Sequence, residues 1–264
     1  AADIKALKVE PAVLKASYNQ AVNLSFSIET WNGQTFPIDA GYITLHTNTG
    51  KVSGSVFTPD QDGRGGILEA TYQGLTVQVP IRAASLFSDT VDNWANDQIN
   101  DLAEAGIIQG YEDGTYRPKE PVTRAQVVTL LARLMQWSAG DRQPVFKDNI
   151  PAWAQDAVAA AVSRGVVKGY PDQTFQPNRP VTRAEISVIM NNAVKFTSGV
   201  AALDFEDTAD IPAWAREAMG RVVSAGVLRG YEGNLIKPGA NLTRAEMAVL
   251  ISRLIGLNYV KVEV

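Results

Sequence analysis

One pattern of residues occurs three times in this chain, always in the same order: a Trp-Ala pair, a Gly-Tyr pair and a Thr-Arg-Ala triplet. The arginine of the triplet stands at positions 124, 183 and 244, so the spacings are 59 residues (124 to 183) and 61 residues (183 to 244). The tryptophans at positions 94, 153 and 214 keep the same two spacings. Because the internal register is kept so closely, we interpret the pattern as one structural unit used three times.

Composition limits the class of protein. The 264 residues suffice for about two domains, and 45% hydrophobic with 20% charged residues is typical of a folded chain. The net charge of −4 and the isoelectric point near 5.2 argue against broad electrostatic binding to nucleic acid or to an anionic membrane. The absence of cysteine excludes disulfides, thiolate metal sites and cysteine nucleophiles.

The chain has no run of 18 or more apolar residues, which predicts no membrane insertion. Its first residues also lack the apolar core of a signal peptide. If the protein is exported, we therefore expect this chain to be a mature form or a fragment, and we interpret it as the C-terminal part of a longer protein.

Residues 1–84 show the period-two alternation of half-buried strands. The clearest runs of alternating hydrophobic residues are Val22, Leu24, Phe26, Ile28 and Leu75, Val77, Val79, Ile81. Gly-, Asn-, Asp- and Pro-rich segments lie between them, and Gln73-Gly74 is predicted to form a hairpin turn in which Gly74 has a positive φ. About six or seven short strands in this length favour a small antiparallel β-sandwich.

From about residue 85 the hydrophobic period becomes helical, in repeats 85–139, 140–198 and 199–264. The first helix of each repeat carries the tryptophan and ends at a glycine suited to a left-handed terminal position: Gly106, Gly165 and Gly226. The second helix follows the Gly-Tyr pair. Its predicted start is a capping box, in which a threonine and a Gln or Glu three residues later bind each other's backbone: Thr123 with Gln126, Thr182 with Glu185, and Thr243 with Glu246.

The arginine after each capping threonine has no role in a capping box. A cation in the first turn opposes the helix dipole by about 0.3–1 kcal/mol, so its recurrence at Arg124, Arg183 and Arg244 needs another reason. One candidate is a ligand carboxylate, bound by the guanidinium and by free helix N–H groups. The other is an internal ion pair, which these features alone favour, with a recurring aspartate: Asp89, Asp148 or Asp207.

The combined motif resembles the surface-layer homology (SLH) repeat. The resemblance covers about 180 of the 264 residues and is carried by the Trp-Ala pair, the Gly-[Ile/Val]-[Ile/Val/Leu]-x-Gly-Tyr segment, the Thr-Arg-Ala-[Glu/Gln] helix start, and Phe-x-Asp at Phe87, Phe146 and Phe205. It implies one all-α pseudo-threefold domain of three helix-loop-helix repeats, with grooves between neighbouring repeats. The stretch ILEATYQGLTVQVPI in the first part resembles bacterial Ig-like (Big-type) domains. The expected fold class is therefore an Ig-like β-sandwich followed by an all-α SLH domain.

The resemblance also implies a function and a location. It implies a secreted protein of the bacterial cell wall or surface layer, anchored non-covalently to secondary cell-wall polymer that bears pyruvate on N-acetylmannosamine. Carried over by position, it implies that Arg124, Arg183 and Arg244 bind the acidic group. The aspartates would accept from sugar hydroxyls or orient the arginines, and the Gly-Tyr pairs would line the grooves: Asp89, Asp148, Asp207, Gly110, Tyr111, Gly169, Tyr170, Gly230 and Tyr231.

The three repeats are not equivalent. Repeat one has Gln126 where the family favours glutamate, a change that a capping box tolerates. Repeat three reads GYEGNLIKP and lacks the turn aspartate found at Asp113 and Asp172, so we expect its groove to be altered or silent. For the tryptophans at 94, 153 and 214, a place in the hydrophobic core is favoured over a sugar platform.

The sequence predicts a binding module rather than an enzyme. Its one histidine, His46, stands in an apparent strand without a neighbouring nucleophile or base, and the acidic residues recur with the repeat instead of forming one asymmetric pair. We expect no cofactor, no metal site and no nucleic-acid partner. The alternative function is self-assembly, in which the repeats pack against neighbouring surface-layer subunits without binding glycan directly.

Overall fold

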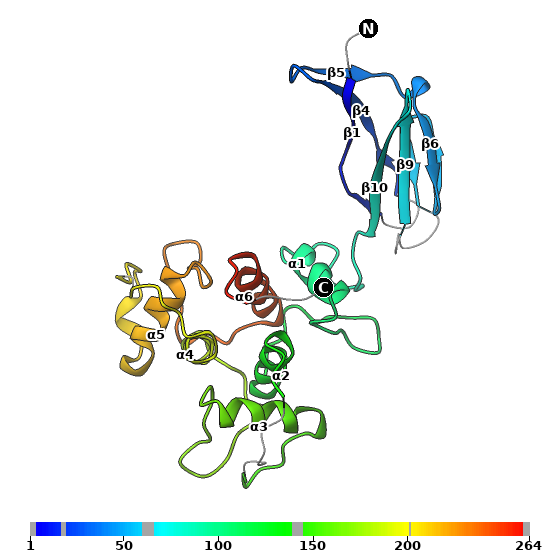
Figure 1. Ribbon diagram of the computed structural model, residues 1–264. Helices are drawn as coiled ribbons and strands as arrows, with labels where there is room; N and C mark the ends of the chain where they lie inside the picture. The colour runs from blue at the N-terminus through cyan, green and yellow to red at the C-terminus, as the bar shows by residue number, and fades with distance from the viewer. Residues whose placement is uncertain (1–3, 17–19, 60–65, 139–144, 201, 261–264) are drawn as a thin grey trace. The chain divides into compact units, whose positions relative to one another are not determined.

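The computed structural model describes residues 4–16, 20–59, 66–138, 145–200 and 202–260. The chain forms two compact units, Ala1–Leu86 and Phe87–Val264 (Figure 1). Among the residues that the structure describes, no helix is long and apolar enough to cross a lipid bilayer.

Strands build the first unit. They form three sheets with the orders β1-β4-β5, β2-β10-β9-β6 and β3-β8-β7. The β2 and β10 strands are parallel, whereas the other pairs are antiparallel. The elements are β1 (Ile4–Glu10), β2 (Leu14–Ala16), β3 (Val22–Asn23), β4 (Ser25–Thr30), β5 (Thr35–Ile38), the 3-10 helix η1 (Ala40–Tyr42), β6 (Thr44–Thr47), β7 (Lys51–Ser53), β8 (Val56–Thr58), β9 (Gly66–Tyr72) and β10 (Leu75–Ala83).

The hairpin between β9 and β10 shows how local sequence fixes strand register. Gln73 and Gly74 both have a positive φ, 48° and 84°, as a tight two-residue hairpin turn requires. The predicted turn is confirmed. Alternate residues of β10 then face inward, and the core of the unit is centred on Leu14, Phe57, Leu68, Val79 and Ile81.

Helices and long loops build the second unit. The glycines that end the first helix of each repeat have φ values of 70°, 69° and 74°, which confirms the predicted left-handed stops at Gly106, Gly165 and Gly226. Two short 3-10 helices, η2 (Ala152–Ala154) and η3 (Thr208–Asp210), precede α3 and α5. The α-helices are α1 (Asn96–Glu104), α2 (Arg124–Leu134), α3 (Gln155–Ser163), α4 (Arg183–Val194), α5 (Ala213–Ser224) and α6 (Arg244–Gly256).

The repeats are joined in a closed cycle. The second helix of each repeat packs on the first helix of the next, α2 on α3 and α4 on α5, and α6 returns to pack on α1 (Figure 1). Between the repeats, Val122 N–H donates to the Leu242 carbonyl at 2.8 Å, Leu242 N–H to Val181 at 2.8 Å, and Val181 N–H to Val122 at 3.1 Å. These residues are 0–1% exposed. The ring of hydrogen bonds therefore satisfies backbone groups that burial would otherwise leave unpaired.

The predicted fold class, an Ig-like β-sandwich followed by an all-α pseudo-threefold domain, is wrong. The first unit has three small sheets and a parallel β2–β10 pair, not the two antiparallel sheets of a sandwich. The second unit is not all-α, because β-bridges such as those of Pro121 with Thr243 and of Thr123 with Pro180 link its repeats. Alternating hydrophobicity indicates strands but not which strands pair, and isolated bridges leave no periodic signal in the sequence. The chain is mixed α and β.

Candidate ligand-binding site

Capping boxes fix the start of the second helix in each repeat. The predicted boxes are present at Thr123, Thr182 and Thr243: each threonine side chain accepts from the backbone three residues on, and the Gln or Glu there accepts from the threonine N–H. In repeat three, Thr243 N–H donates to Glu246 Oε2 at 2.8 Å. The arginine that follows the threonine is therefore held at the first position of a rigid helix.

Each of these arginines reaches into the next repeat of the cycle. Arg183 is 4% exposed, and its Nε and Nη2 donate to the carbonyls of Ile236 and Arg229, both at 2.7 Å. The corresponding bonds run from Arg124 to Phe175 (3.1 Å) and Lys168 (2.6 Å), and from Arg244 to Tyr116 (2.8 Å) and Gln109 (3.2 Å). Two carbonyls satisfy part of each buried guanidinium, which desolvation would otherwise make costly.

The recurring aspartates bind the same loops from the other side. Both oxygens of Asp207 accept from the backbone, from Ile236 N–H at 2.8 Å and from Lys237 N–H at 2.7 Å. The peptide group between Ile236 and Lys237 thus lies between a carboxylate at its N–H and the Arg183 guanidinium at its C=O. Such a chain of hydrogen bonds is mutually polarising. It recurs with Asp89 on Tyr116 and Arg117, and with Asp148 on Phe175 and Gln176.

These contacts replace the ion pair expected between the arginines and the aspartates. The oxygens of Asp89, Asp148 and Asp207 are bonded to backbone amides, so the aspartates act on the arginines through a shared peptide group. Burial raises the pKa of Asp207, but the hydrogen bonds from the amides of Ile236 and Lys237 outweigh this effect, and the pKa is lowered overall.

The Gly-Tyr pair brings the tyrosine ring against the arginine of the preceding repeat. The Arg183 guanidinium lies 4.4 Å from the centroid of the Tyr231 ring. A Cβ on Gly230 would lie 2.7 Å from Phe205 Cε1 and 2.9 Å from the Leu235 carbonyl, so only glycine permits this close approach. The equivalent arginine–ring distances are 5.1 Å for Arg124 on Tyr170 and 5.0 Å for Arg244 on Tyr111.

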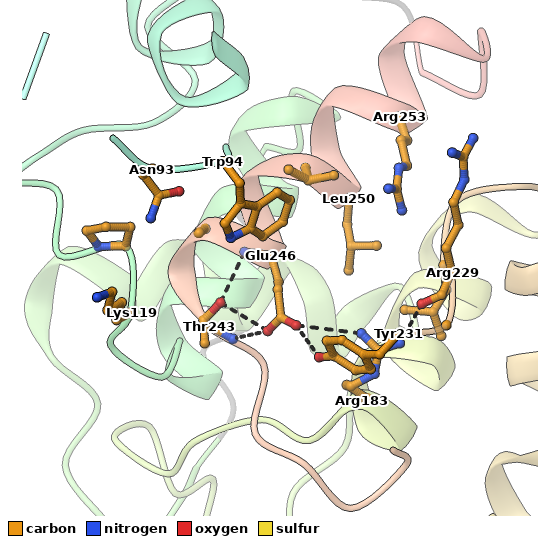
Figure 2. Close-up of a pocket in the computed structure, with 15 residues that line it drawn as sticks. Asn93, Trp94, Lys119, Arg183, Arg229, Tyr231, Thr243, Glu246, Leu250 and Arg253 are labelled. Atoms are coloured by element: carbon orange, nitrogen blue, oxygen red, sulfur yellow. Dashed lines mark hydrogen bonds and ion pairs between the residues drawn. The ribbon is translucent and has the colours of Figure 1, made fainter. Parts of the chain in front are cut away.

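A cavity of about 500 Å³ opens beside Tyr231. Figure 2 shows Glu246 in its wall, linked to Thr243 on one side and to Tyr231 and Arg183 on the other. Repeats one, two and three all contribute to the lining, which consists of Asn93, Trp94, Pro118, Lys119, Arg183, Leu228, Arg229, Gly230, Tyr231, Thr243, Ala245, Glu246, Val249, Leu250 and Arg253.

The lining of this cavity is strongly cationic. Among the described residues that form it, Glu246 is the single carboxylate, whereas four cations line the same cavity: Lys119, Arg183, Arg229 and Arg253. Burial lowers the pKa of Arg253, and the neighbouring Arg229 and Arg183 lower it further, so these positive charges act on one another. An anion bound among them gains Coulombic energy in a partly desolvated place.

The prediction that the recurring tryptophans belong to the core is wrong. Trp94, Trp153 and Trp214 are 66%, 58% and 61% exposed. Trp94 lies two residues before α1, Trp153 lies in η2, and Trp214 is the second residue of α5. In each pair the alanine that follows is the buried member. The exposed indole of Trp94 lines the cavity (Figure 2).

The other two grooves differ from this one. The groove of repeat one, lined by Tyr116, Gln126, Trp153 and Arg244 among others, has a volume of about 110 Å³. In repeat two, Arg179 enters the space beside Tyr170: its Nη1 donates to Glu185 Oε1 at 2.6 Å and to the Tyr170 hydroxyl.

Repeat three was expected to have an altered or silent groove; its groove differs from the other two in that it contains the 500 Å³ cavity. The turn aspartates stabilise their own turns and do not form the cavities, so a repeat without this aspartate can still have an open groove. Asp113 accepts from the backbone and side chain of Thr115, at 3.0 and 2.6 Å, and so stabilises a turn without lining any of the cavities described above. The sequence analysis missed three cations of the lining: Lys119, Arg229 and Arg253. None of these positions carries an arginine or a lysine in all three repeats, so none of them belongs to the recurring motif.

Comparison with known proteins places this geometry in a family. The model of the S-layer homology domain matches residues 86–128, 147–186 and 204–248. The Surface-layer 125 kDa protein of Lysinibacillus sphaericus is 32% identical over 184 residues, which are 67% of this chain and 16% of that protein. An S-layer protein of Bacillus thuringiensis subsp. finitimus is 28% identical over 193 residues, 72% of this chain and 23% of that protein. An amylopullulanase of Thermoanaerobacterium thermosulfurigenes is 32% identical over 171 residues, 62% of this chain and 9% of that enzyme.

The chain spans less than a quarter of the length of each of these relatives. The residues that match the S-layer homology model lie in the second unit, apart from residue 86. The predicted cell-surface location is confirmed by this match. The second unit of this chain contains three S-layer homology domains.

Proposed function

We propose that the second unit anchors a surface protein non-covalently to the bacterial cell wall by binding an acidic glycan, a secondary cell-wall polymer that contains pyruvylated N-acetylmannosamine. The observation that carries the proposal is the cavity beside Tyr231, where four cations and an exposed indole surround a space of about 500 Å³. A ketal-linked pyruvate supplies a carboxylate for the cations, and the sugar ring supplies an apolar face for Trp94.

Arg183 has a double role in this proposal. Its Nε and Nη2 bind carbonyls of repeat three, while its Nη1 lies on the cavity side, 3.8 Å from Glu246 Oε1. The carbonyl anchors hold the guanidinium in place before a ligand arrives, which reduces the entropy lost on binding. Arg229 and Arg253 supply the more accessible charge.

The module binds the polymer without cleaving it. The cavity lining offers Glu246 as its one carboxylate among the described residues, whereas cleavage of a glycosidic bond commonly requires a pair. Incubation of the purified chain with the polymer therefore leaves the number of reducing ends unchanged. A steady release of new reducing ends would contradict this part of the proposal.

Calorimetric titration with the methyl glycoside of pyruvylated N-acetylmannosamine, and with the same sugar without pyruvate, tests the proposal. We expect the pyruvylated sugar to bind and the sugar without pyruvate not to bind. Arg253→Ala should weaken it by about 10- to 100-fold, in line with loss of a charged hydrogen bond. Trp94→Ala should weaken it by about tenfold without unfolding the protein, because the indole is 66% exposed.

Trp214→Ala is the matched control. This indole is 61% exposed and does not line the 500 Å³ cavity, so its removal should leave the affinity unchanged. Equal binding with and without pyruvate, or equal effects of the two tryptophan variants, would contradict the proposal. Self-assembly without glycan binding predicts concentration-dependent association that Trp94→Ala reduces and that the pyruvylated sugar does not inhibit.

A further inference from the structure

A second cavity continues the first toward the C-terminal end of α6. Its volume is about 450 Å³. Four residues, Trp94, Arg229, Val249 and Arg253, line both cavities. The remaining residues of the second cavity are Gln98, Ser252, Gly256 and Leu257. The two cavities are therefore consecutive parts of one groove, joined along a shared wall of one indole and two guanidinium groups.

The second cavity has the chemistry of a sugar subsite. Gln98 and Ser252 offer uncharged hydrogen-bonding groups suited to hydroxyl and acetamido groups. Arg229 and Arg253 add positive charge, and no residue of the described lining carries a negative one. Trp94 adds an exposed aromatic face. Such a lining accepts a neutral or anionic sugar and disfavours a cationic ligand.

We infer that the second cavity binds the next sugar residue of the same acidic glycan, so that the groove holds two consecutive residues of the polymer, one on each side of the Trp94 indole. The inference rests on the proposed function, since the first cavity must hold the pyruvylated sugar. A polymer has to leave that cavity in some direction, and the shared wall leads into the second one.

Gly256 provides a way to fill the second cavity selectively. It is the last residue of α6, it lines the second cavity and not the first, and a Cβ placed on it meets no atom within 4 Å. Gly256→Trp therefore places an indole in the second cavity without a clash at its Cβ. Gly199→Trp is the matched control, because its Cβ also meets no atom within 4 Å and Gly199 lines neither cavity.

The experiment compares two ligands by calorimetric titration: the methyl glycoside of pyruvylated N-acetylmannosamine, and a trisaccharide in which two N-acetylhexosamines extend it. In the parent chain the trisaccharide should bind about tenfold more tightly, equivalent to about 1.4 kcal/mol. Gly256→Trp should abolish this gain and leave the affinity for the monosaccharide within about twofold, whereas Gly199→Trp should keep the gain.

A second variant tests the subsite without adding volume. Gln98→Ala combined with Ser252→Ala should reduce the gain of the trisaccharide about fivefold, through lost hydrogen bonds. Equal affinity of the parent chain for the two ligands would overturn the inference while leaving the proposed function intact. So would a trisaccharide gain that survives both Gly256→Trp and the double variant. Absence of pyruvate-dependent binding of either ligand would overturn the proposed function and this inference with it.

Discussion

The grooves beside Tyr170 and Tyr231 are built from equivalent residues, yet one contains a side chain of the protein itself and the other is open. In repeat two, the Arg179 guanidinium bridges Tyr170 and Glu185. In repeat three, the Tyr231 hydroxyl donates directly to Glu246, and a cavity of about 500 Å³ remains. The same scaffold thus gives an internally occupied groove and an accessible one.

One position carries the side chain that enters the groove of repeat two. Arg179 lies six residues before Glu185, and the residue six positions before Glu246 is Ala240. The backbone is used alike in both places, since the Arg179 and Ala240 carbonyls accept from Arg124 N–H and Arg183 N–H, each at 2.9 Å. With the backbone alike, the arginine side chain at this position supplies the guanidinium that contacts the tyrosine and the glutamate in repeat two, and the alanine of repeat three supplies none.

The largest loss of stability should come from removing the buried arginines, which make equivalent contacts beside the two grooves. Arg124→Ala and Arg183→Ala should each lower the free energy of unfolding by about 2–4 kcal/mol, because each leaves two carbonyl acceptors of the next repeat without their donor. Urea unfolding followed by circular dichroism measures this. Losses below about 0.5 kcal/mol for both variants would show that the carbonyl anchors contribute little.

The next largest loss of stability should come from substituting the glycines of the Gly-Tyr pairs. A Cβ would approach a loop carbonyl to 2.7 Å at Gly110, 2.9 Å at Gly230 and 3.1 Å at Gly169. Substitution by alanine should destabilise the unit by about 1–3 kcal/mol, in the order Gly110, Gly230, Gly169, because overpacking costs more as the approach shortens. Gly233→Ala, at a glycine with φ of 78° and no atom near its Cβ, separates steric overlap from backbone strain. Equal losses at the three Gly-Tyr positions would contradict the steric explanation.

Features that depend on neighbouring residues could be predicted from the sequence. The capping boxes, the left-handed glycines and the Gln73-Gly74 turn all follow from local backbone chemistry. The partners of the arginines could not, because a carbonyl is common to every residue and the acceptors lie 51 and 53 residues away for Arg124 Nε and Arg183 Nε.

The pairing of the predicted strands and the choice of the open groove were missed for a related reason. The parallel pairing of Leu14 with Ile81 joins strands far apart in the chain, which alternation does not reveal. The exposure of Trp94 depends on which elements of other repeats cover the start of α1. Arg179 belongs to no recurring motif. A comparison of the repeats identifies the residues that they share and therefore does not identify Arg179, which enters a groove in one repeat only.

Exchanging the side chains at positions 179 and 240 tests the comparison directly. Ala240→Arg should weaken binding of the pyruvylated sugar by about tenfold or more, because its guanidinium can reach Tyr231 and Glu246 as Arg179 reaches Tyr170 and Glu185. Arg179→Ala should lower the free energy of unfolding by less than about 1 kcal/mol, because its ion pair is partly exposed.

The readouts of this exchange are the affinity of Ala240→Arg and the stoichiometry of Arg179→Ala, both from calorimetric titration. Arg179→Ala should raise the number of bound sugars per chain from one toward two. Ala240→Lys is the control, since a lysine lacks the planar fork that binds two acceptors at once. Unchanged affinity in Ala240→Arg, with the fold retained, would show that the cavity is not closed by this route.

The smallest effect concerns the turn aspartate that repeat three lacks. Hydrogen bonds from Thr115, followed by the contact with Arg117, lower the pKa of Asp113 from 3.8 to about 2. A carboxyl with a lowered pKa stabilises the folded state fully above 3.8, and this contribution is lost as the pH falls through about 2. Asp113→Asn should therefore lower the melting temperature slightly near neutral pH, and the difference from the parent chain should shrink as the pH falls from about 4 to about 2.

Repeat three has glycine at the equivalent position, 233. Gly233→Asp should show no such pH-dependent gain in melting temperature unless the turn of that repeat can adopt the geometry of the other two. A melting difference for Asp113→Asn that stays constant between pH 4 and pH 2 would mean that the charge of Asp113 does not stabilise the turn, and that the repeats differ there in shape alone.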